Sequence, residues 1–268
     1  MGDDMAIALT IAGSDSGGGA GIQADLKTFS ALGVYGASAL TAITAQNTRT
    51  VAAVEPVSPA MIRAQIEAVL DDLDVGAVKI GMLGTPEAVH AVADALAGRR
   101  IPVVLDPVMI AKSGDRLIRD EAIAALRELL FPLTAVLTPN LPEAARLLGR
   151  MVATDPTEIA AQGTALRALG PEWVLMKGGH ARGAVCTDRL VGPRPKDFSA
   201  PRIDTRNTHG TGCSLSAAIA AGLAQGMDVP AATARAHGWL HRAILAADGL
   251  GIGQGQGPVH HFHDWWTA

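Results

Sequence analysis

Residues 207–214, with the sequence Asn-Thr-His-Gly-Thr-Gly-Cys-Ser, place two glycines, small hydroxyl residues and a thiol directly before a small-residue run typical of a buried helix. The N–H groups of a first helical turn have no partner within the helix, and the helix dipole favours negative charge there. Glycine also lets a ligand approach the backbone closely. Gly210, Thr211 and Gly212 are therefore a candidate anion hole for a phosphate or a phosphoryl group in transfer. An ordinary glycine-rich loop before a buried helix is the alternative.

A second glycine-rich segment, residues 13–21, follows the first apolar run and contains five glycines. In form it matches a dinucleotide-binding fingerprint, which needs an acidic residue about 20 positions further on for the ribose. The sequence has no Asp or Glu between Asp25 and Glu55, which disfavours a dinucleotide-dependent oxidoreductase. A tight strand-to-helix turn would need fewer glycines, so the segment predicts a small ligand lying against bare backbone.

Four polar side chains follow short apolar runs that we interpret as strands: Asp106, Asn140, Glu143 and Lys177. The carboxylates can hold Mg²⁺, which usually keeps several waters, and Lys177 can reach a phosphate as a point charge. Structural alternatives stay open. Asn140 and Glu143 also fit a capping box at a helix start, and Lys177 also fits a solvated strand end.

Gln46 follows another strand-like run. Its amide carries a donor and an acceptor, which suits an aminopyrimidine edge or another amide-like heterocycle; capping of a backbone group is the alternative. Residues 109–116 are polar, contain a glycine and follow Asp106. They predict a flap that closes over the site, with a plain strand-to-helix loop as the alternative.

The elements that must position these groups alternate along the chain. Strands are predicted at residues 5–12, 37–45, 77–80, 102–105, 135–137 and 173–176, with a hairpin within 184–201. Helices are predicted at residues 22–32, 58–73, 85–97, 121–130, 142–148, 158–169, 211–226 and 230–247. Short apolar strands between helices indicate βαβ units and a mostly parallel sheet. Such a sheet carries its site at the carboxyl ends of its strands, where the polar residues gather.

Length and composition set outer limits. The 268 residues, 49% hydrophobic and 3% aromatic, predict one domain, residues 1–268, with a core of small and aliphatic side chains. A net charge of −4 without basic runs argues against a nucleic-acid partner. No apolar stretch approaches the roughly 20 residues that span a membrane, and the acidic start does not resemble a signal peptide. With two distant cysteines, these features predict a soluble cytoplasmic protein.

Two further features favour structural interpretations. The tail at residues 258–266, Pro-Val-His-His-Phe-His-Asp-Trp-Trp, has the clustered histidines of some metal sites. Because Asp264 is the one other ligand type beside them, we expect a C-terminal segment packed by its tryptophans instead. Cys186, in the predicted hairpin, is expected to be a small core residue.

Taken in order, the motifs resemble the ribokinase superfamily and, more closely, the hydroxymethylpyrimidine/phosphomethylpyrimidine kinases of thiamine biosynthesis. The resemblance spans nearly the whole chain. It rests on residues 9–15 (LTIAGSD), 18–29 (GGAGIQADLKTF), 45–48 (AQNT), 79–83 (KIGML), 105–109 (LDPVM), 138–144 (TPNLPEA), 177–180 (KGGH), 207–213 (NTHGTGC) and 257–262 (GPVHHF).

The resemblance implies a three-layer α/β fold with helices on both faces of a mostly parallel sheet, ATP as co-substrate, Mg²⁺ and a homodimer. Asn140 and Glu143 would form the magnesium and phosphate element, Lys177 would face the nucleotide phosphates, and Gly210–Cys213 would be the anion hole. Thr44 stands where some relatives carry an aliphatic residue. The implied pyrimidine pocket comprises Gly13, Ala20, Asp25, Gln46, Met82 and Val108.

Cys213 stands where sugar kinases of the superfamily carry an aspartate base. A thiol at a helix N-terminus is expected to have a depressed pKa. His209, one turn earlier, would share its proton, so that the pair accepts the proton of a primary alcohol. Phosphorylating a monophosphate needs no base, because that acceptor is already largely ionised near neutral pH. Cys213 is therefore expected to matter more for a first transfer than for a second.

The leading hypothesis is an ATP- and Mg²⁺-dependent kinase that phosphorylates 4-amino-5-hydroxymethyl-2-methylpyrimidine and then its monophosphate. A pyridoxal or pyridoxine kinase on the same scaffold is the alternative among enzymes. A ligand-binding or regulatory protein without catalysis is the alternative class. The paired carboxylates beside an anion hole disfavour that class, because a mere binder has no use for them.

Overall fold

A nine-stranded sheet runs through the computed structural model, which describes residues 5–109, 118–180 and 183–266. The order of its strands is β3-β2-β1-β4-β5-β6-β7-β8-β9. The six strands from β2 to β7 in this order run parallel, whereas β3, β8 and β9 pair antiparallel with their neighbours. The strands are β1 (Ile7–Asp15), β2 (Tyr35–Gln46), β3 (Val51–Pro56), β4 (Ala77–Ile80), β5 (Val103–Leu105), β6 (Thr134–Leu137), β7 (Trp173–Met176), β8 (Val185–Val191) and β9 (Lys196–Pro201).

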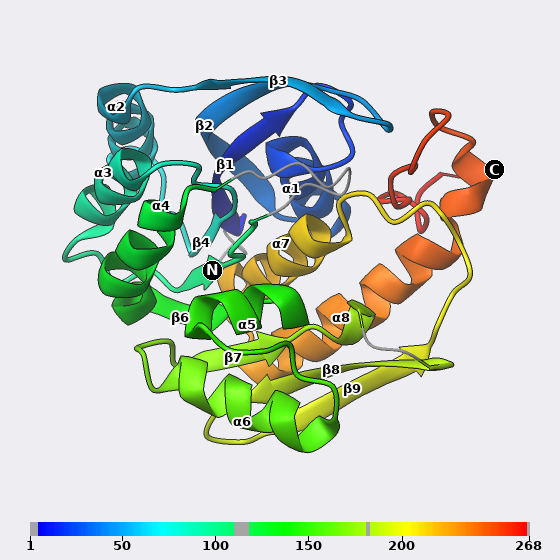
Figure 1. The fold of residues 1–268 in the computed structure, drawn as a ribbon. Coiled ribbons are helices and arrows are strands. Elements are labelled where there is room, and N and C mark those ends of the chain that lie inside the picture. Colours follow the sequence, from blue (N-terminus) through cyan, green and yellow to red (C-terminus); the bar gives the residue numbers. More distant parts are fainter. Residues whose placement is uncertain (1–4, 110–117, 181–182, 267–268) are drawn as a thin grey trace.

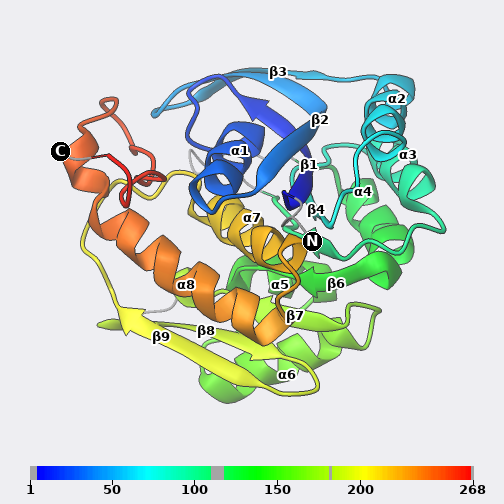
Figure 2. The ribbon, with the colours of Figure 1, turned by 180° about the vertical axis from the view of Figure 1, so that it is seen from behind.

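Helices cover both faces of this sheet, so the predicted three-layer α/β architecture is confirmed (Figures 1 and 2). One face packs against α2 (Pro59–Leu70), α3 (Pro86–Leu96), α4 (Asp120–Ala125), α5 (Leu141–Leu148) and α6 (Pro156–Arg167). The other packs against α1 (Gly21–Ala31), α7 (Thr211–Ala224) and α8 (Val229–Leu245). Because the central strands are buried on both faces, they read as continuous apolar runs rather than alternating ones.

Side-chain caps fix several helix starts where the sequence predicts them. Ser58 accepts a hydrogen bond from the Met61 N–H, and Thr85 from the Ala88 N–H, each with a proline in the first turn. Asn140 begins α5 with the predicted capping box, completed by Glu143. These caps also fix where the strand before each helix ends, and therefore where the site begins.

Three elements differ from the sequence prediction. β1 continues past a bulge near Ala12 to Asp15, because its pairing with β2 extends into the glycine-rich segment. β3 was not predicted: it is a solvent-exposed edge strand without a buried face to produce a pattern. The helix expected at residues 121–130 is α-helical only to Ala125, continues as a wider π-helical turn over Leu126–Leu130, and is followed by a 3₁₀ turn, Phe131–Leu133.

Two further expectations concern membrane-spanning helices and the predicted flap. Within the described residues, no helix combines the length and apolarity that crossing a membrane requires. Residues 110–116 of the predicted flap lie outside the described residues, while Met109, its first residue, is buried.

Candidate active site

A cavity of about 760 Å³ opens at the carboxyl ends of the parallel strands and reaches the first turn of α7. It gathers nearly all of the side chains and backbone groups that the sequence singles out, although they come from distant parts of the chain. The predicted residues that line it are Gly13, Ala20, Gln46, Met82, Asp106, Val108, Asn140, Glu143, Lys177, His209, Gly210, Thr211, Gly212 and Cys213.

The first turn of α7 has the geometry that an anion hole requires. Gly210 is its N-cap with φ 79°, a left-handed conformation in which a side chain would collide with the Gly19 carbonyl. No side chain caps the described turn. A Cβ built on Gly212 would lie 3.3 Å from Lys177 Nζ and 3.4 Å from Asp106 Oδ2. The backbone of the turn therefore faces both a cation and a carboxylate at close range.

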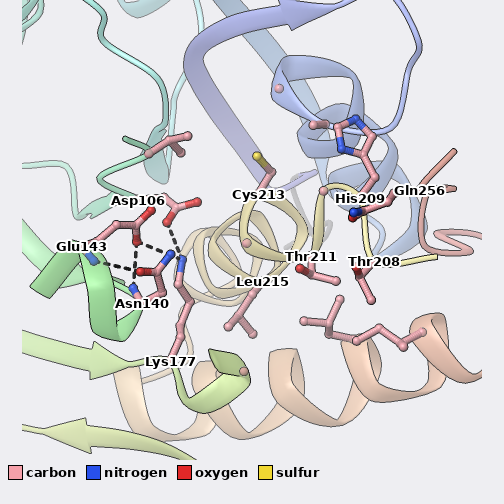
Figure 3. Close-up of a pocket in the computed structure, with 18 of the residues that line it drawn as sticks. Asp106, Asn140, Glu143, Lys177, Thr208, His209, Thr211, Cys213, Leu215 and Gln256 are labelled. Atoms are coloured by element: carbon pink, nitrogen blue, oxygen red, sulfur yellow. Dashed lines mark hydrogen bonds and ion pairs between the residues drawn. The ribbon is translucent and has the colours of Figure 1, made fainter. Parts of the chain in front are cut away.

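Lys177 joins the two predicted carboxylates (Figure 3). Its Nζ lies 2.7 Å from Asp106 Oδ1 and 3.9 Å from Glu143 Oε2. Burial opposes the charged amine, but these two carboxylates hold the pKa of Lys177 above its ordinary value. The same Glu143 oxygen accepts the Asn140 N–H at 2.8 Å. Glu143 therefore caps α5 and faces the site at once, and Lys177 is an ion-paired residue rather than a solvated strand end.

The local charge balance fits a divalent cation. Burial, followed by the repulsion of Asp106, raises the pKa of Glu143 to about 7 even though Lys177 attracts its charged form. Without a metal, Glu143 is therefore about half protonated at neutral pH, and a divalent cation would favour its charged form. Mg²⁺ commonly binds one or two protein carboxylates together with substrate phosphates. The described residues include no cluster of three or more metal-ligating side chains.

The Asp15 side chain binds the backbone of its own loop, the glycine-rich segment. Its carboxylate accepts the N–H groups of Gly17, Gly19 and Ala20 at 2.8 to 3.1 Å and the His209 Nε2 at 2.8 Å. Burial alone would raise the pKa of Asp15, but His209 and the backbone donors lower it. The prediction that a ligand lies against these amides needs correction, because a side chain of the same loop binds them.

Cys213 is a half-buried thiol on the cavity wall, and the predicted depression of its pKa is wrong. Burial raises the pKa of Cys213 to about 11, although Lys79 and the Gly21 N–H favour the thiolate. Desolvation thus outweighs the position at the helix N-terminus. The hydrogen bonds of the described residues also give His209 a different partner from the predicted one, since its Nε2 binds Asp15.

Lys79 is a site residue that sequence reasoning missed. It lines the cavity, is fully buried, and places its Nζ 2.8 Å from Asp25 Oδ2. Thr10 Oγ1 donates to the same oxygen at 2.6 Å. Asp25, predicted as part of the pyrimidine pocket, lies fully buried behind the cavity wall and holds Lys79. A lysine inside the apolar run Ala77–Ile80 was the available signal, because a buried charge needs a partner.

The far end of the cavity was also missed. Between β8, β9 and α8 it is lined by Cys186, Asp188, Ile203, His237 and Leu240. Cys186 is therefore half-buried on the cavity wall and not a core residue. The signal was weak, because hairpin strands and one face of a long helix carry no motif.

The histidine-rich tail packs by different residues from those predicted. Val259, His260 and His261 are buried, whereas Trp265 and Trp266 are 68% and 58% exposed. The tail lies against α8 and the start of α7, where the His260 N–H donates to the Ala243 carbonyl and His261 contacts Ser214.

Solved structures that share this fold include a pyridoxal kinase and a phosphomethylpyrimidine kinase, so the fold is that of the ribokinase-like small-molecule kinases. The sequence model of the phosphomethylpyrimidine kinase family matches residues 15–260. The chain belongs to that family.

Individual relatives agree with this assignment. A hydroxymethylpyrimidine/phosphomethylpyrimidine kinase of Rhizobium meliloti is 60% identical over 262 residues, covering 97% of this chain and 98% of the relative. One from Escherichia coli is 51% identical over 261 residues, covering 97% and 98%. A Bacillus subtilis pyridoxal kinase in complex with ADP has a TM-score of 0.90 at 38% identity, covering 98% of this chain and all of its own. A phosphomethylpyrimidine kinase from Clostridium difficile has a TM-score of 0.79 at 44% identity, covering 89% and 99%.

Proposed function

We propose that the chain is an ATP-dependent kinase that phosphorylates 4-amino-5-hydroxymethyl-2-methylpyrimidine and then its monophosphate, in thiamine biosynthesis. The family match supports the reaction class. The observation that carries the proposal within the molecule is the position of the α7 turn. Its Gly212 backbone faces Lys177 and Asp106 inside the cavity. Fixed backbone amides and a cation at that point would stabilise the negative charge that develops on a phosphoryl group in transfer.

The two ends of the cavity suit two different ligands. Gly13, Gln46, Met82 and Val108 line the end at β1, β2 and β4. Bare backbone, apolar side chains and one amide that both donates and accepts suit an aminopyrimidine. The end between β9 and α8 then receives the nucleoside of ATP, so that its phosphates reach the α7 turn and Lys177.

The protein's own groups position the substrates and balance the negative charge of the phosphates. Lys177 attracts the nucleotide phosphates, and the Gly212 and Cys213 N–H groups face the transferred group. Mg²⁺, held by Asp106 and Glu143, would neutralise phosphate charge. Cys213 stays a neutral thiol at physiological pH, because burial raises its pKa to about 11. As a neutral thiol it cannot take the proton of the acceptor, so its role is to position the acceptor hydroxyl as a weak hydrogen-bond partner in the first transfer, and the second transfer, to an already ionised phosphate, depends on it less.

We also infer the setting of the enzyme. The nine-stranded sheet joins both ends of the cavity, which supports a single kinase domain over residues 1–268. The edge strand β3 is exposed along residues 52–56, which include the apolar Ala52, Ala53 and Val54. An apolar sheet edge of this kind suits pairing with a second copy, so we propose a homodimer. ATP supply and two free thiols suit the cytoplasm.

One experiment separates this function from its alternative. The protein is incubated with ATP, Mg²⁺ and either hydroxymethylpyrimidine or pyridoxal, and monophosphate and diphosphate products are followed by mass. We expect both phosphorylated pyrimidines, with the monophosphate appearing first. Pyridoxal is the necessary comparison, because the structure is close to that of a pyridoxal kinase. Turnover of pyridoxal alone would overturn the proposal, and turnover of neither would remove both candidates.

A further inference from the structure

The C-terminal segment Gln256–His261 runs beside the anion-binding turn. The His209 N–H, directly before Gly210, donates to the Gly257 carbonyl at 3.0 Å. His209 and Pro258 form an isolated parallel bridge. The Gly257 N–H in turn donates to Asn207 Oδ1 at 3.1 Å. The backbone that enters the turn is therefore held by a segment almost 50 residues further along the chain.

A buried side-chain contact continues this attachment into the helix. Ser214 Oγ lies 2.9 Å from His261 Nε2, and the two side chains belong to residues 0% and 4% exposed. The Ser214 N–H donates to the Gly210 carbonyl at 2.8 Å, so Ser214 closes the first turn. Burial lowers the pKa of His261 to about 3, so its neutral ring makes this hydrogen bond over the whole working range of pH.

We propose that Gln256–His261 is a positioning element of the phosphoryl-transfer site, in which His261 acts through Ser214 to fix the first turn of α7. The inference rests on the proposed function and deepens it. The Gly212 backbone must stay aligned with Lys177 and Asp106, and an error of about 1 Å in such an arrangement can cost two orders of magnitude in rate. Gln256 itself lines the cavity beside Thr208 and His209 (Figure 3).

Other contacts keep the tail in place when the Ser214 contact is removed. The His260 N–H binds the Ala243 carbonyl of α8 at 2.9 Å, and Trp265 Nε1 binds the Ala31 carbonyl at 3.2 Å. A variant that lacks only the serine hydroxyl therefore tests the coupling to the turn and not the folding of the tail.

The chain offers a control on the neighbouring helix, α8. Thr233 is also fully buried, but its hydroxyl donates to the Val229 carbonyl of its own helix at 2.7 Å, and Thr233 is not among the residues that line the cavity. We expect Ser214→Ala to lower kcat for pyrimidine phosphorylation about tenfold with KM changed less than about threefold, whereas Thr233→Val, which also removes a buried hydroxyl, stays within about twofold of wild type. Equal kcat values for the two variants at equal melting temperature would overturn the proposal.

Two substitutions at His261 extend the test. Glutamine can place a polar atom near the position of Nε2, so His261→Gln is expected to keep at least about half of kcat, and His261→Leu to lose it as Ser214→Ala does. The reverse order would contradict a positioning role. If the wild-type protein turned over no substrate, the proposed function would fail separately. Inorganic phosphate binding, measured by calorimetry, would then decide, with weaker binding by Ser214→Ala than by Thr233→Val supporting the inference and equal binding overturning it.

Discussion

Lys177 Nζ lies 2.7 Å from Asp106 Oδ1, and this ion pair borders the space that a side chain at position 212 would enter. A methyl group on Gly212 would lie 3.3 Å from the lysine nitrogen and would occupy the gap between amide and cation. We expect Gly212→Ala to lower kcat for pyrimidine phosphorylation by about two orders of magnitude, comparable to losing one oxyanion-hole donor. Steady-state kinetics with saturating ATP measure this loss.

The control for this substitution is Gly238→Ala. Gly238 lies within α8, and a methyl group there would meet open space. Kinetics should stay at the wild-type level, and stability should stay equal or rise slightly, because alanine is the better helix former. Similar losses in both variants would mean that Gly212 has no special relation to Lys177 and Asp106.

Substitution of Asp25 or Lys79 is expected to change the stability of the folded protein rather than its ligand binding. Their ion pair, with Nζ and Oδ2 2.8 Å apart, is fully buried, and Asp25 Oδ1 has no hydrogen-bond partner among the described residues. Removing one partner leaves the other charge buried and unpaired. Lys79→Met and Asp25→Leu should each lower the free energy of unfolding by about 3 to 5 kcal/mol. Urea unfolding followed by circular dichroism measures these changes.

The double variant distinguishes this explanation from simple loss of packing. Lys79→Met combined with Asp25→Leu leaves no unpaired charge, so its stability should exceed that of either single variant. Additive losses would show that the pair is not coupled. Pyrimidine turnover by the double variant then tells whether the Lys79 charge, which faces the cavity, also serves the reaction.

The fold was predictable from the sequence because its parallel strands are buried on both faces. Runs such as Ala77–Ile80 and Trp173–Met176 read as strands, and caps such as Ser58 and Thr85 read as helix starts, since both signals are local. β3 could not be predicted, because an exposed edge strand has no buried face that would produce an alternating pattern. Pairing with β2 also carried β1 into the glycine-rich segment, and no local pattern encodes that extension.

The site was predictable as a set of residues but not as a set of environments. Strand ends and glycine turns marked Asp106, Lys177 and Gly212, because these positions follow from topology. The state of Cys213 did not follow, since burial by side chains from other elements decides its pKa. Asp15 was missed for the same reason. Its carboxylate accepts hydrogen bonds from backbone N–H groups of the loop, which the sequence shows only as a run rich in glycine.

The two cysteines should react with iodoacetamide at different rates. Only the thiolate reacts. Both thiols are half-buried on the cavity wall, and burial raises the pKa of both, for Cys213 to about 11. At pH 7.5 we expect Cys186 to be alkylated first, with at least about a tenfold difference in rate, measured by peptide mass spectrometry. Faster labelling of Cys213 would mean that the helix N-terminus depresses its pKa after all.

The role of Cys213 in the reaction separates the two transfers. Cys213→Ala should lower the rate of the first phosphorylation about tenfold and that of the second less than about threefold, because only the first acceptor is a hydroxyl that the neutral thiol can position as a weak hydrogen-bond partner, whereas the second is an already ionised phosphate. Single-turnover assays that start from hydroxymethylpyrimidine or from its monophosphate measure the two steps separately. An equal loss in both would count against this division.

Asp15 makes stability depend on acid pH. Hydrogen bonds from His209 and the loop backbone hold the pKa of Asp15 below the ordinary aspartate value of 3.8. Its contribution to stability is therefore fully present above that pH and is lost as the pH falls through the lower pKa of the folded state. We expect Asp15→Asn to melt below wild type at pH 7 and the difference to shrink below about pH 4. Asp197→Asn is the matched control, because Arg189 on the surface also lowers the pKa of Asp197, yet an exposed pair contributes little. A difference between wild type and Asp15→Asn that stayed constant down to pH 3 would show that the carboxylate charge does not hold the loop.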